Sequence, residues 1–284
     1  MEYEVKKDFD QITLKDDFMF FSVMSDKELC KELLERILDI KIKKLVYVAG
    51  QDTKKDSYDG KGVRLDIYTE DSENTVYNVE MQAGKSTNLP KRSRFYQSAI
   101  DLNQLHAGMD YDALKNTIVI FICTFDVFKK DFLKYTFKNI CIEDKELVLN
   151  DATTKVFVNT TATLDDENLN PKLVSLIEYI NSETITDEYT KKLDEAVRIK
   201  RRSADWRVKY MKYELNLLER EREGEKRGRE EGRIEGIIEG RVEGEEKLAT
   251  LMNLLYREHR FEDIGRVASD KQYKEKLYKE FNIQ

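Results

Sequence analysis

Histidine and cysteine are scarce in this sequence, and their scarcity excludes several kinds of catalytic site. Only two histidines occur, His106 and His259, so a zinc site built on several histidines is excluded. The three cysteines (Cys30, Cys123 and Cys141) are odd in number and form no Cys-x-x-Cys pair, which predicts reduced thiols in a cytoplasmic protein. No Gly-rich phosphate loop precedes residue 220, and no Gly-x-Ser-x-Gly motif occurs. Carboxylate and metal chemistry remains.

Long apolar runs and an N-terminal targeting segment are also missing. The longest apolar run, Thr117–Phe125, is too short to span a bilayer and predicts a buried central strand instead. The first residues, Met1–Glu4, lack the basic and apolar regions of a signal peptide. The 284 residues carry a net charge of −7, so any binding to nucleic acid must depend on local basic patches. The length allows one sizeable core with appendages, or two small domains.

Two short segments of alternating polarity hold the densest group of polar residues. They are Val63–Glu70 and Val76–Gln82, and the turn-forming residues between them predict a β-hairpin. If the hairpin folds about Glu73, Asp66 lies opposite Glu80. Two facing carboxylates repel each other unless a hard divalent cation such as Mg²⁺ binds between them. The pattern therefore indicates either a metal site or the solvated face of an ordinary hairpin.

The flanking sequence predicts an α/β domain that ends near residue 160–185. Helical spacing predicts a helix at Lys27–Leu38 with Ser25 as its cap. Strands are expected at Ile42–Val48, Thr117–Cys123 and Lys155–Asn159, the last of them at the edge of the sheet. A second helix opens at Pro90, ends at Gly108 and has a predicted buried stripe of Phe95, Ala99, Leu102 and Leu105.

The chain becomes helical after Pro171, with a long charged helix expected at Leu193–Leu218. Glycines then recur every four residues from Gly224 to Gly244, and each costs a helix about 1 kcal/mol relative to Ala. This repeat predicts either a solvated, partly frayed stalk or a self-associating stalk in which the glycines permit close helix packing. Small helices are expected at Phe261–Ala268 and Tyr273–Phe281. The predicted segments are residues 1–185, 186–222, 223–246 and 247–284.

Cations occupy the first turn of the second predicted helix, where they oppose the helix dipole. Lys91, Arg92 and Arg94 are expected to converge with free backbone N–H groups on a spot suited to a phosphate. The alternative is solvation, or ion pairing with Glu80 or another nearby acid. Gln97 lies one turn onward and extends the polar face. A phosphate anchor beside metal-bound carboxylates is what phosphodiester hydrolysis requires.

Several of these segments resemble one known family. The runs Arg64–Tyr68, Tyr77–Gln82, Leu89–Ser98, Leu14–Phe20 and Ile118–Phe125 are similar to those of the PD-(D/E)XK nuclease family transposases, also called recombination-promoting nucleases. The Gly-and-charge repeat resembles that family too. The resemblance implies an αβββαβ core like that of restriction endonucleases, with a helical C-terminal extension. It also implies Mg²⁺-dependent DNA cleavage in recombination or mobile-element activity, with Mn²⁺ as an alternative ion.

The same resemblance assigns the metal site. Asp66 and Glu80 would be the ligands, and the backbone carbonyl of Met81 would complete the inner shell. Leu65 replaces the proline of the superfamily motif, a minor change. Gln82 occupies the position of the superfamily lysine, where it would position water. A neutral amide can only hydrogen-bond, whereas a lysine ammonium also stabilises negative charge.

The resemblance also assigns contacts around this site. The expected DNA contacts are Lys91, Arg92, Arg94 and Gln97. An acid of the first helix often assists in this superfamily, and the sequence offers Glu28, Glu32 and Glu35 without choosing among them. The competing interpretation is a protein that keeps the nuclease fold but only binds nucleic acid or associates with itself.

Overall fold

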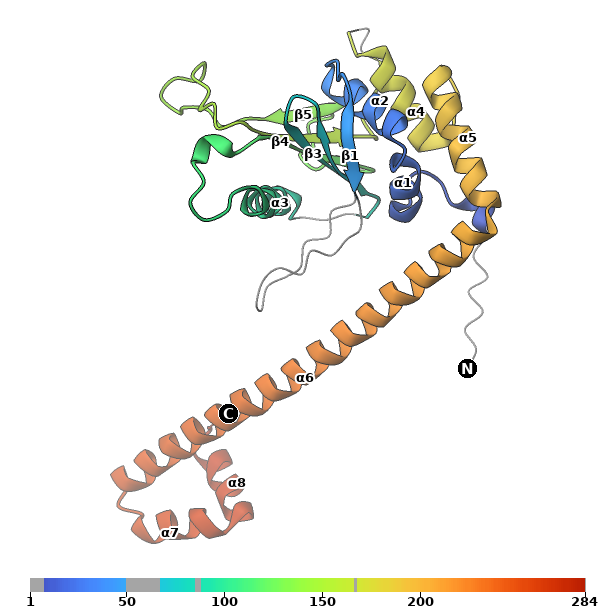
Figure 1. The fold of residues 1–284 in the computed structure, drawn as a ribbon. Coiled ribbons are helices and arrows are strands. Elements are labelled where there is room, and N and C mark those ends of the chain that lie inside the picture. The colour runs from blue at the N-terminus through green and yellow to red at the C-terminus, as the bar shows by residue number, and fades with distance from the viewer. Residues whose placement is uncertain (1–7, 50–66, 85–87, 166–167, 284) are drawn as a thin grey trace. The chain divides into compact units, whose positions relative to one another are not determined.

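A six-stranded sheet organises the N-terminal part of the chain (Figure 1). The computed structural model describes residues 8–49, 67–84, 88–165 and 168–283. In spatial order the strands are β1 (Leu45–Ala49), β2 (Ile67–Asp71), β3 (Thr75–Gln82), β4 (Asn116–Cys123), β6 (Thr153–Asn159) and β5 (Lys134–Phe137). The pairs β3–β4 and β4–β6 are parallel, and the other pairs are antiparallel. The predicted mixture of α and β structure is therefore confirmed.

Helices cover both faces of this sheet (Figure 1). Those that contact strands are α1 (Asp17–Met24), α2 (Lys27–Leu38) and α3 (Leu89–Gln104), while α4 (Pro171–Ser182) and α5 (Glu188–Arg202) pack on α1 and α2. Short 3-10 turns occur at Phe9–Gln11 and Tyr111–Ala113. On one face, Tyr96 and Ile100 of α3 pack in a cluster that includes Phe121. Side chains alternate along a strand, so Val79 and Ile120 point to the opposite face of the sheet from Phe121. They are buried there, beside α1 and α2.

The register of the predicted hairpin is confirmed for the residues that the structure describes. Thr69 pairs with Tyr77 and Glu70 pairs with Val76, which is the pairing of a hairpin folded about Glu73. Asp71 closes the turn, because its Oδ1 accepts the backbone N–H groups of the two residues that flank Asn74. Asp66 belongs to residues 50–66, outside the described part, so its pairing with Glu80 stays a prediction.

Three features of the helices and strands differ from the predictions. Asp26, not Ser25, caps α2, since its Oδ1 accepts the N–H of Glu28 at 2.9 Å. The edge strand is β5, which the sequence did not reveal, and β6 lies inside the sheet between β4 and β5. The expected helix at Leu193–Leu218 is interrupted at Ser203, whose hydroxyl accepts the N–H of Trp206 and starts a new helix.

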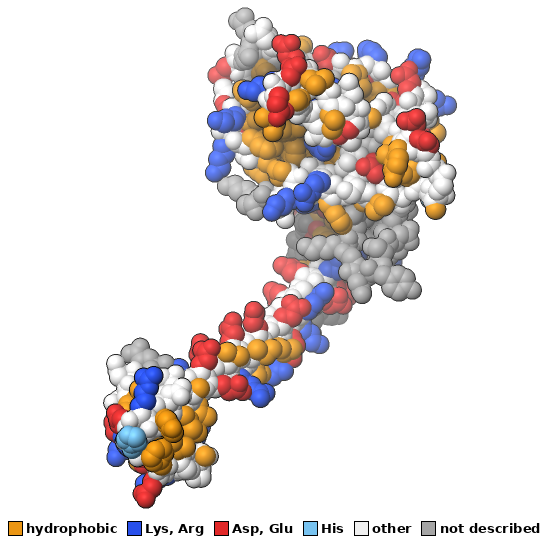
Figure 2. Space-filling model, turned by 90° about the vertical axis from the view of Figure 1, so that its left-hand side faces the viewer, with side chains coloured by type: hydrophobic (Ala, Val, Ile, Leu, Met, Phe, Trp, Pro, Cys, Tyr) orange, Lys and Arg blue, Asp and Glu red, His pale blue; other side chains and the backbone are white. Residues whose placement is uncertain are grey.

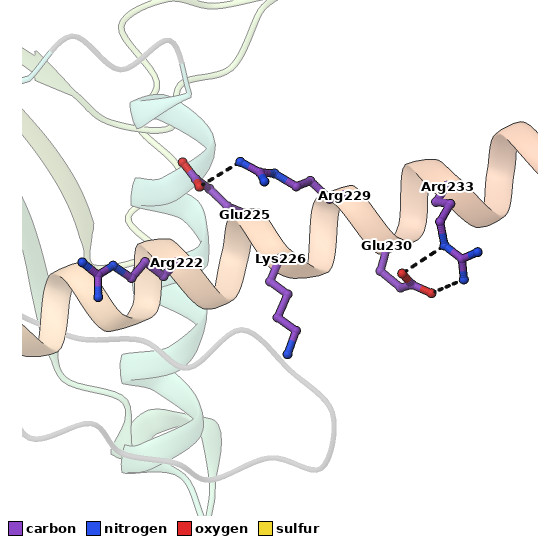
Figure 3. A pocket seen from close by; sticks show the side chains of 6 residues that line it. All are labelled: Arg222, Glu225, Lys226, Arg229, Glu230 and Arg233. Carbon is purple, nitrogen blue, oxygen red and sulfur yellow. Dashed lines mark hydrogen bonds and ion pairs between the residues drawn. The ribbon is translucent and has the colours of Figure 1, made fainter. Parts of the chain in front are cut away.

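That new helix, α6 (Ala204–Arg257), runs without a break through the glycine repeat. Its start packs on α1 through Trp206 and Tyr210, which contact Phe18. Along the repeat the side chains are exposed, and acidic, basic and hydrophobic residues lie side by side (Figure 2). Ion pairs join Glu225 to Arg229 and Glu230 to Arg233 (Figure 3). Such pairs each add a few tenths of a kcal/mol and offset part of the cost of glycine.

The end of α6 belongs to a second small core. The chain divides into the compact units Met1–Met211 and Lys212–Gln284. In the second unit, α7 (Phe261–Ser269) and α8 (Lys271–Glu280) fold where small helices are predicted. The buried residues of this core are Leu251, Leu255, Val267 and Leu277. Among the described residues, no helix has the length and apolar character needed to cross a membrane.

Candidate active site

The even-numbered residues of β3 carry the candidate site. Side chains alternate along a strand, so Asn78, Glu80 and Gln82 share the face that α3 covers. Because β3 has a strand on each side and a helix above it, Glu80 is only 2 % exposed and Asn78 is fully buried. The predicted polar face therefore exists, but it is an interior surface and not a solvated one.

Glu80 is held by polar groups from two elements. On its own strand, the side-chain amide of Asn78 donates to Oε1 at 3.3 Å. From α3, the Tyr96 hydroxyl donates to Oε2 at 3.4 Å, and the Arg92 guanidinium lies 3.6 Å from the same oxygen. A buried carboxylate without partners would cost several kcal/mol, so these contacts explain why Glu80 can lie inside the protein.

Arg92 is fixed from three directions. Its Nη1 donates to Oε1 of Gln82 at 2.8 Å, and its Nη2 donates to the Tyr96 hydroxyl at 2.7 Å. The guanidinium also lies over the rings of Tyr96 and Phe121, 5.4 and 5.7 Å from their centroids. The Arg92 side chain is 32 % exposed. Arg92 therefore stands between a buried carboxylate and solvent.

The predicted convergence of three cations at the start of α3 is wrong. Lys91 and Arg94 are exposed, whereas Arg92 turns inward to Glu80. Residues two apart on a helix point about 200° apart, so Arg92 and Arg94 occupy opposite sides. For Arg92, the alternative of ion pairing with Glu80 is confirmed.

The predicted buried stripe of α3 is also wrong. Phe95 is 48 % exposed and Leu102 is 77 % exposed, while the buried residues of the helix are Leu89, Ser93, Tyr96, Gln97 and Ile100. The helix ends at Gln104, before Gly108, and Leu105 is its C-cap. The polar residues of β3 need hydrogen-bond partners, and the polar side of α3 supplies them. Satisfying these groups outweighs burying two more apolar side chains.

Gln97 and Asp101 form a second polar pair beneath α3. Gln97 is 7 % exposed and donates to Oδ1 of Asp101 at 2.9 Å. Its burial is incompatible with the predicted direct contact to DNA. Burial also raises the pKa of the Asp101 carboxyl above its usual range, against the opposing effects of Gln97 and of Lys155.

Cys123 lies at the same end of the sheet, paired in register with Gln82. Burial raises the pKa of its thiol to about 12, although the nearby Arg92 charge acts in the opposite direction. The thiol is therefore neutral at physiological pH and is a poor nucleophile. Carboxylate and cation chemistry remains at this end of β3.

Oxygen donors at the end of β3 fit a hard divalent cation. They include the Glu80 carboxylate and the Met81 carbonyl. Farther back on the same face of β3, the Asn78 side-chain oxygen is buried and has no hydrogen-bond partner among the described residues. The Gln82 amide donates to the Met81 carbonyl at 3.0 Å and so lies beside these donors. Within the described ranges, no cluster of three or more His, Cys, Asp or Glu side chains could hold an ion. Asp66, the predicted second carboxylate, lies outside those ranges.

The three acids of α2 are in different environments. Glu32 pairs with Arg36 at 2.8 Å, and Glu35 accepts the backbone N–H of Ile42 at 2.9 Å. The side chain of Glu28 is exposed. That one of these acids assists at the metal site stays a prediction.

Tyr96 is the site residue that sequence reasoning did not single out. Its hydroxyl links Arg92 to Glu80, and its ring stacks on Phe121 with centroids 5.9 Å apart. The available signal was its spacing, because a residue four positions after Arg92 lies on the same face of a helix.

Comparison with known proteins gives one result. The family model described as PD-(D/E)XK nuclease family transposase matches residues 14–230. Neither the curated proteins nor the solved structures contain a match to the chain. The matched range includes the whole six-stranded sheet and α3.

Proposed function

Because the chain belongs to the PD-(D/E)XK nuclease family transposases, we propose that it is a metal-dependent DNA endonuclease in recombination or mobile-element activity. The observation that carries this proposal is the buried Glu80 carboxylate, 2 % exposed, beside the partly exposed Arg92 guanidinium. A buried carboxylate beside a cation that reaches solvent is suited to metal and phosphate chemistry. The order α2, β1, β2, β3, α3, β4 supports the αβββαβ core of that superfamily.

The proposed site holds Mg²⁺, or Mn²⁺, on Asp66, Glu80 and the Met81 carbonyl. Such an ion, when bound, lowers the pKa of water and stabilises negative charge on a phosphodiester. Gln82 would orient water or a neighbouring group through its amide. The exposed Lys91 and Arg94 would attract the DNA backbone from the first turn of α3.

The test is nicking of supercoiled plasmid by the purified protein, with Mg²⁺ and with chelator. We expect cleavage only with the divalent ion, and a loss of at least about a hundredfold after Asp66→Ala combined with Glu80→Ala. Glu73→Gln is a matched control, because it removes an acid from the same hairpin at an exposed turn position. Cleavage that survives the double substitution contradicts the site assignment.

A non-catalytic nucleic-acid binder that keeps this fold is the second candidate. It is favoured by the Arg92–Glu80 contact, which already neutralises the carboxylate. Salt-sensitive DNA binding without divalent-dependent nicking would support it against the nuclease.

Self-association through the α6 repeat is a separate part of the proposal. A Cβ added to any of the glycines from Gly224 to Gly244 would meet no described atom within 4 Å outside the adjacent helix backbone, so packing among the described residues does not require them. Four aliphatic side chains on the same segment are about half exposed: Ile234, Ile237, Ile238 and Val242. A second copy of the helix would cover these aliphatic side chains, which lie on the face opposite Gly232, Gly236 and Gly240.

A further inference from the structure

We propose that Arg92 supplies the positive charge that the superfamily places on a lysine at the position of Gln82. This inference rests on the proposed nuclease function. Its starting point is the neutral amide of Gln82, whose oxygen accepts a hydrogen bond from Arg92 at 2.8 Å. The cation that position 82 lacks is therefore present one hydrogen bond away.

The Arg92 guanidinium has more contacts that fix its position than a surface residue that only binds phosphate would have. It touches Gln82, Tyr96 and Glu80, and it lies over two aromatic rings. A guanidinium has five N–H groups, more than the two that donate to Gln82 and Tyr96. With 32 % of the side chain exposed, the guanidinium can meet a phosphate that approaches from solvent.

Gln82 acts as a positioning residue in this arrangement. Its amide donates to the Met81 carbonyl while its oxygen accepts from Arg92. The amide thus links the guanidinium to the backbone at the end of β3. Glutamine suits this task better than lysine, because a lysine ammonium would repel Arg92 and could not accept its hydrogen bond.

In hydrolysis, the oxygen of water forms a bond to phosphorus and the bond to one ester oxygen breaks. The attacking water releases a proton to solvent, and the leaving oxygen takes one up. Negative charge grows on the phosphoryl oxygens while the first bond forms and the second breaks. A preorganised cation beside these oxygens lowers the barrier. Arg92 gives up no proton, so its contribution is electrostatic.

The same geometry predicts that Arg92 weakens the binding of a divalent cation. The guanidinium lies 3.6 Å from the Glu80 oxygen, so it repels any divalent ion that shares this carboxylate. Removing the charge should therefore tighten metal binding while it slows cleavage. A residue that only anchors DNA would do neither.

The experiment compares four variants of the full chain with wild type: Arg92→Gln, Arg92→Lys, Arg94→Gln, and Gln82→Lys combined with Arg92→Gln. Plasmid cleavage gives kcat and KM, calorimetric titration gives Mn²⁺ affinity, and Trp206 fluorescence gives thermal stability. For Arg92→Gln we expect kcat to fall about a hundredfold or more with little change in KM. We also expect Mn²⁺ to bind about three- to tenfold more tightly. Arg94→Gln, which removes a proposed DNA contact, should act mainly by raising KM.

The double variant, which moves the positive charge from position 92 to position 82, gives the decisive test. The lysine of the double variant should restore kcat at least about tenfold over Arg92→Gln, because it places an ammonium at the superfamily position. A rise in KM alone for Arg92→Gln, or unchanged kcat, overturns the inference. If Arg92→Gln does not fold, Arg92→Lys decides, since a folded variant without measurable kcat also overturns it. Absence of cleavage by wild type contradicts the proposed function itself.

Discussion

Asp187 has two separable roles, and replacing it should lower the stability of the first unit by two separable amounts. One carboxylate oxygen caps α5 by accepting the N–H of Thr190 at 2.9 Å. The other accepts from Nη1 of Arg36 at 2.6 Å, which joins α5 to α2. Arg36 is only 5 % exposed and also pairs with Glu32, so the two carboxylates together compensate its buried charge.

The two roles predict different losses for two substitutions. Asp187→Asn keeps a capping oxygen, since Asn caps helices as well as Asp does. It removes a hydrogen bond between charged groups, worth about 1.5–3 kcal/mol, and the 28 % exposure of Asp187 favours the lower end. Asp187→Ala removes the cap as well, worth about 1 kcal/mol. The expected losses in free energy of unfolding are about 1.5 and about 2.5 kcal/mol.

Urea unfolding followed by Trp206 fluorescence measures these losses. Trp206 is the only tryptophan, and it is 5 % exposed against Phe18 and Tyr210 of the first unit. Equal losses for Asn and Ala would show that the cap contributes nothing. Wild-type stability in both variants would refute the reasoning, because Arg36 would then be satisfied without Asp187.

The same network predicts a pH dependence. Burial alone would raise the pKa of Asp187, but hydrogen bonds from Thr190 and Arg36 outweigh it and hold the pKa below the ordinary 3.8. A carboxyl whose folded pKa is depressed adds stability above its unfolded pKa and loses it as the pH falls through the folded value. The difference between wild type and Asp187→Asn should therefore be full at pH 7 and shrink below about pH 3.8. A constant difference between pH 7 and pH 3 would contradict this account.

Two further predictions concern other parts of the chain. Burial raises the pKa of Asp101, so its ionisation costs stability as the pH rises through the raised value. Asp101→Asn keeps an acceptor for Gln97 and should gain in urea midpoint relative to wild type between pH 4 and pH 7; an unchanged difference would contradict this sign. A chain ended after residue 220 should keep the Trp206 fluorescence of the folded first unit and lose self-association in light scattering. An unchanged oligomeric state would remove the glycine repeat from the proposal.

Local sequence patterns predicted the elements that hold the candidate site. The helix at Lys27–Leu38 has the predicted bounds, because its apolar residues repeat at helical spacing and Asp39 ends it in a left-handed conformation. The hairpin register followed from turn formers placed symmetrically about Glu73. Both features depend on residues close together in the sequence.

The face of α3 could not be predicted in this way. Hydrophobicity alone assigns Phe95 and Leu102 to the core, and both are exposed. The orientation of the helix depends instead on Glu80 of β3, whose buried carboxylate requires Arg92 and Tyr96 of α3 as partners. Such a requirement appears only once the two elements are brought together. The short edge strand β5 was missed for a similar reason, since pairing with β6 defines its four residues.

The first turns of α6 set a limit on where the chain can be cut. Trp206 and Tyr210 pack against Phe18, and the Tyr210 hydroxyl donates at 2.8 Å to Asp16. Asp16 in turn caps α1 by accepting the N–H of Met19. A protease cut or a fusion junction placed before Tyr210 would uncover an aromatic core and remove a partner of that cap. A junction placed in the exposed repeat would leave both intact.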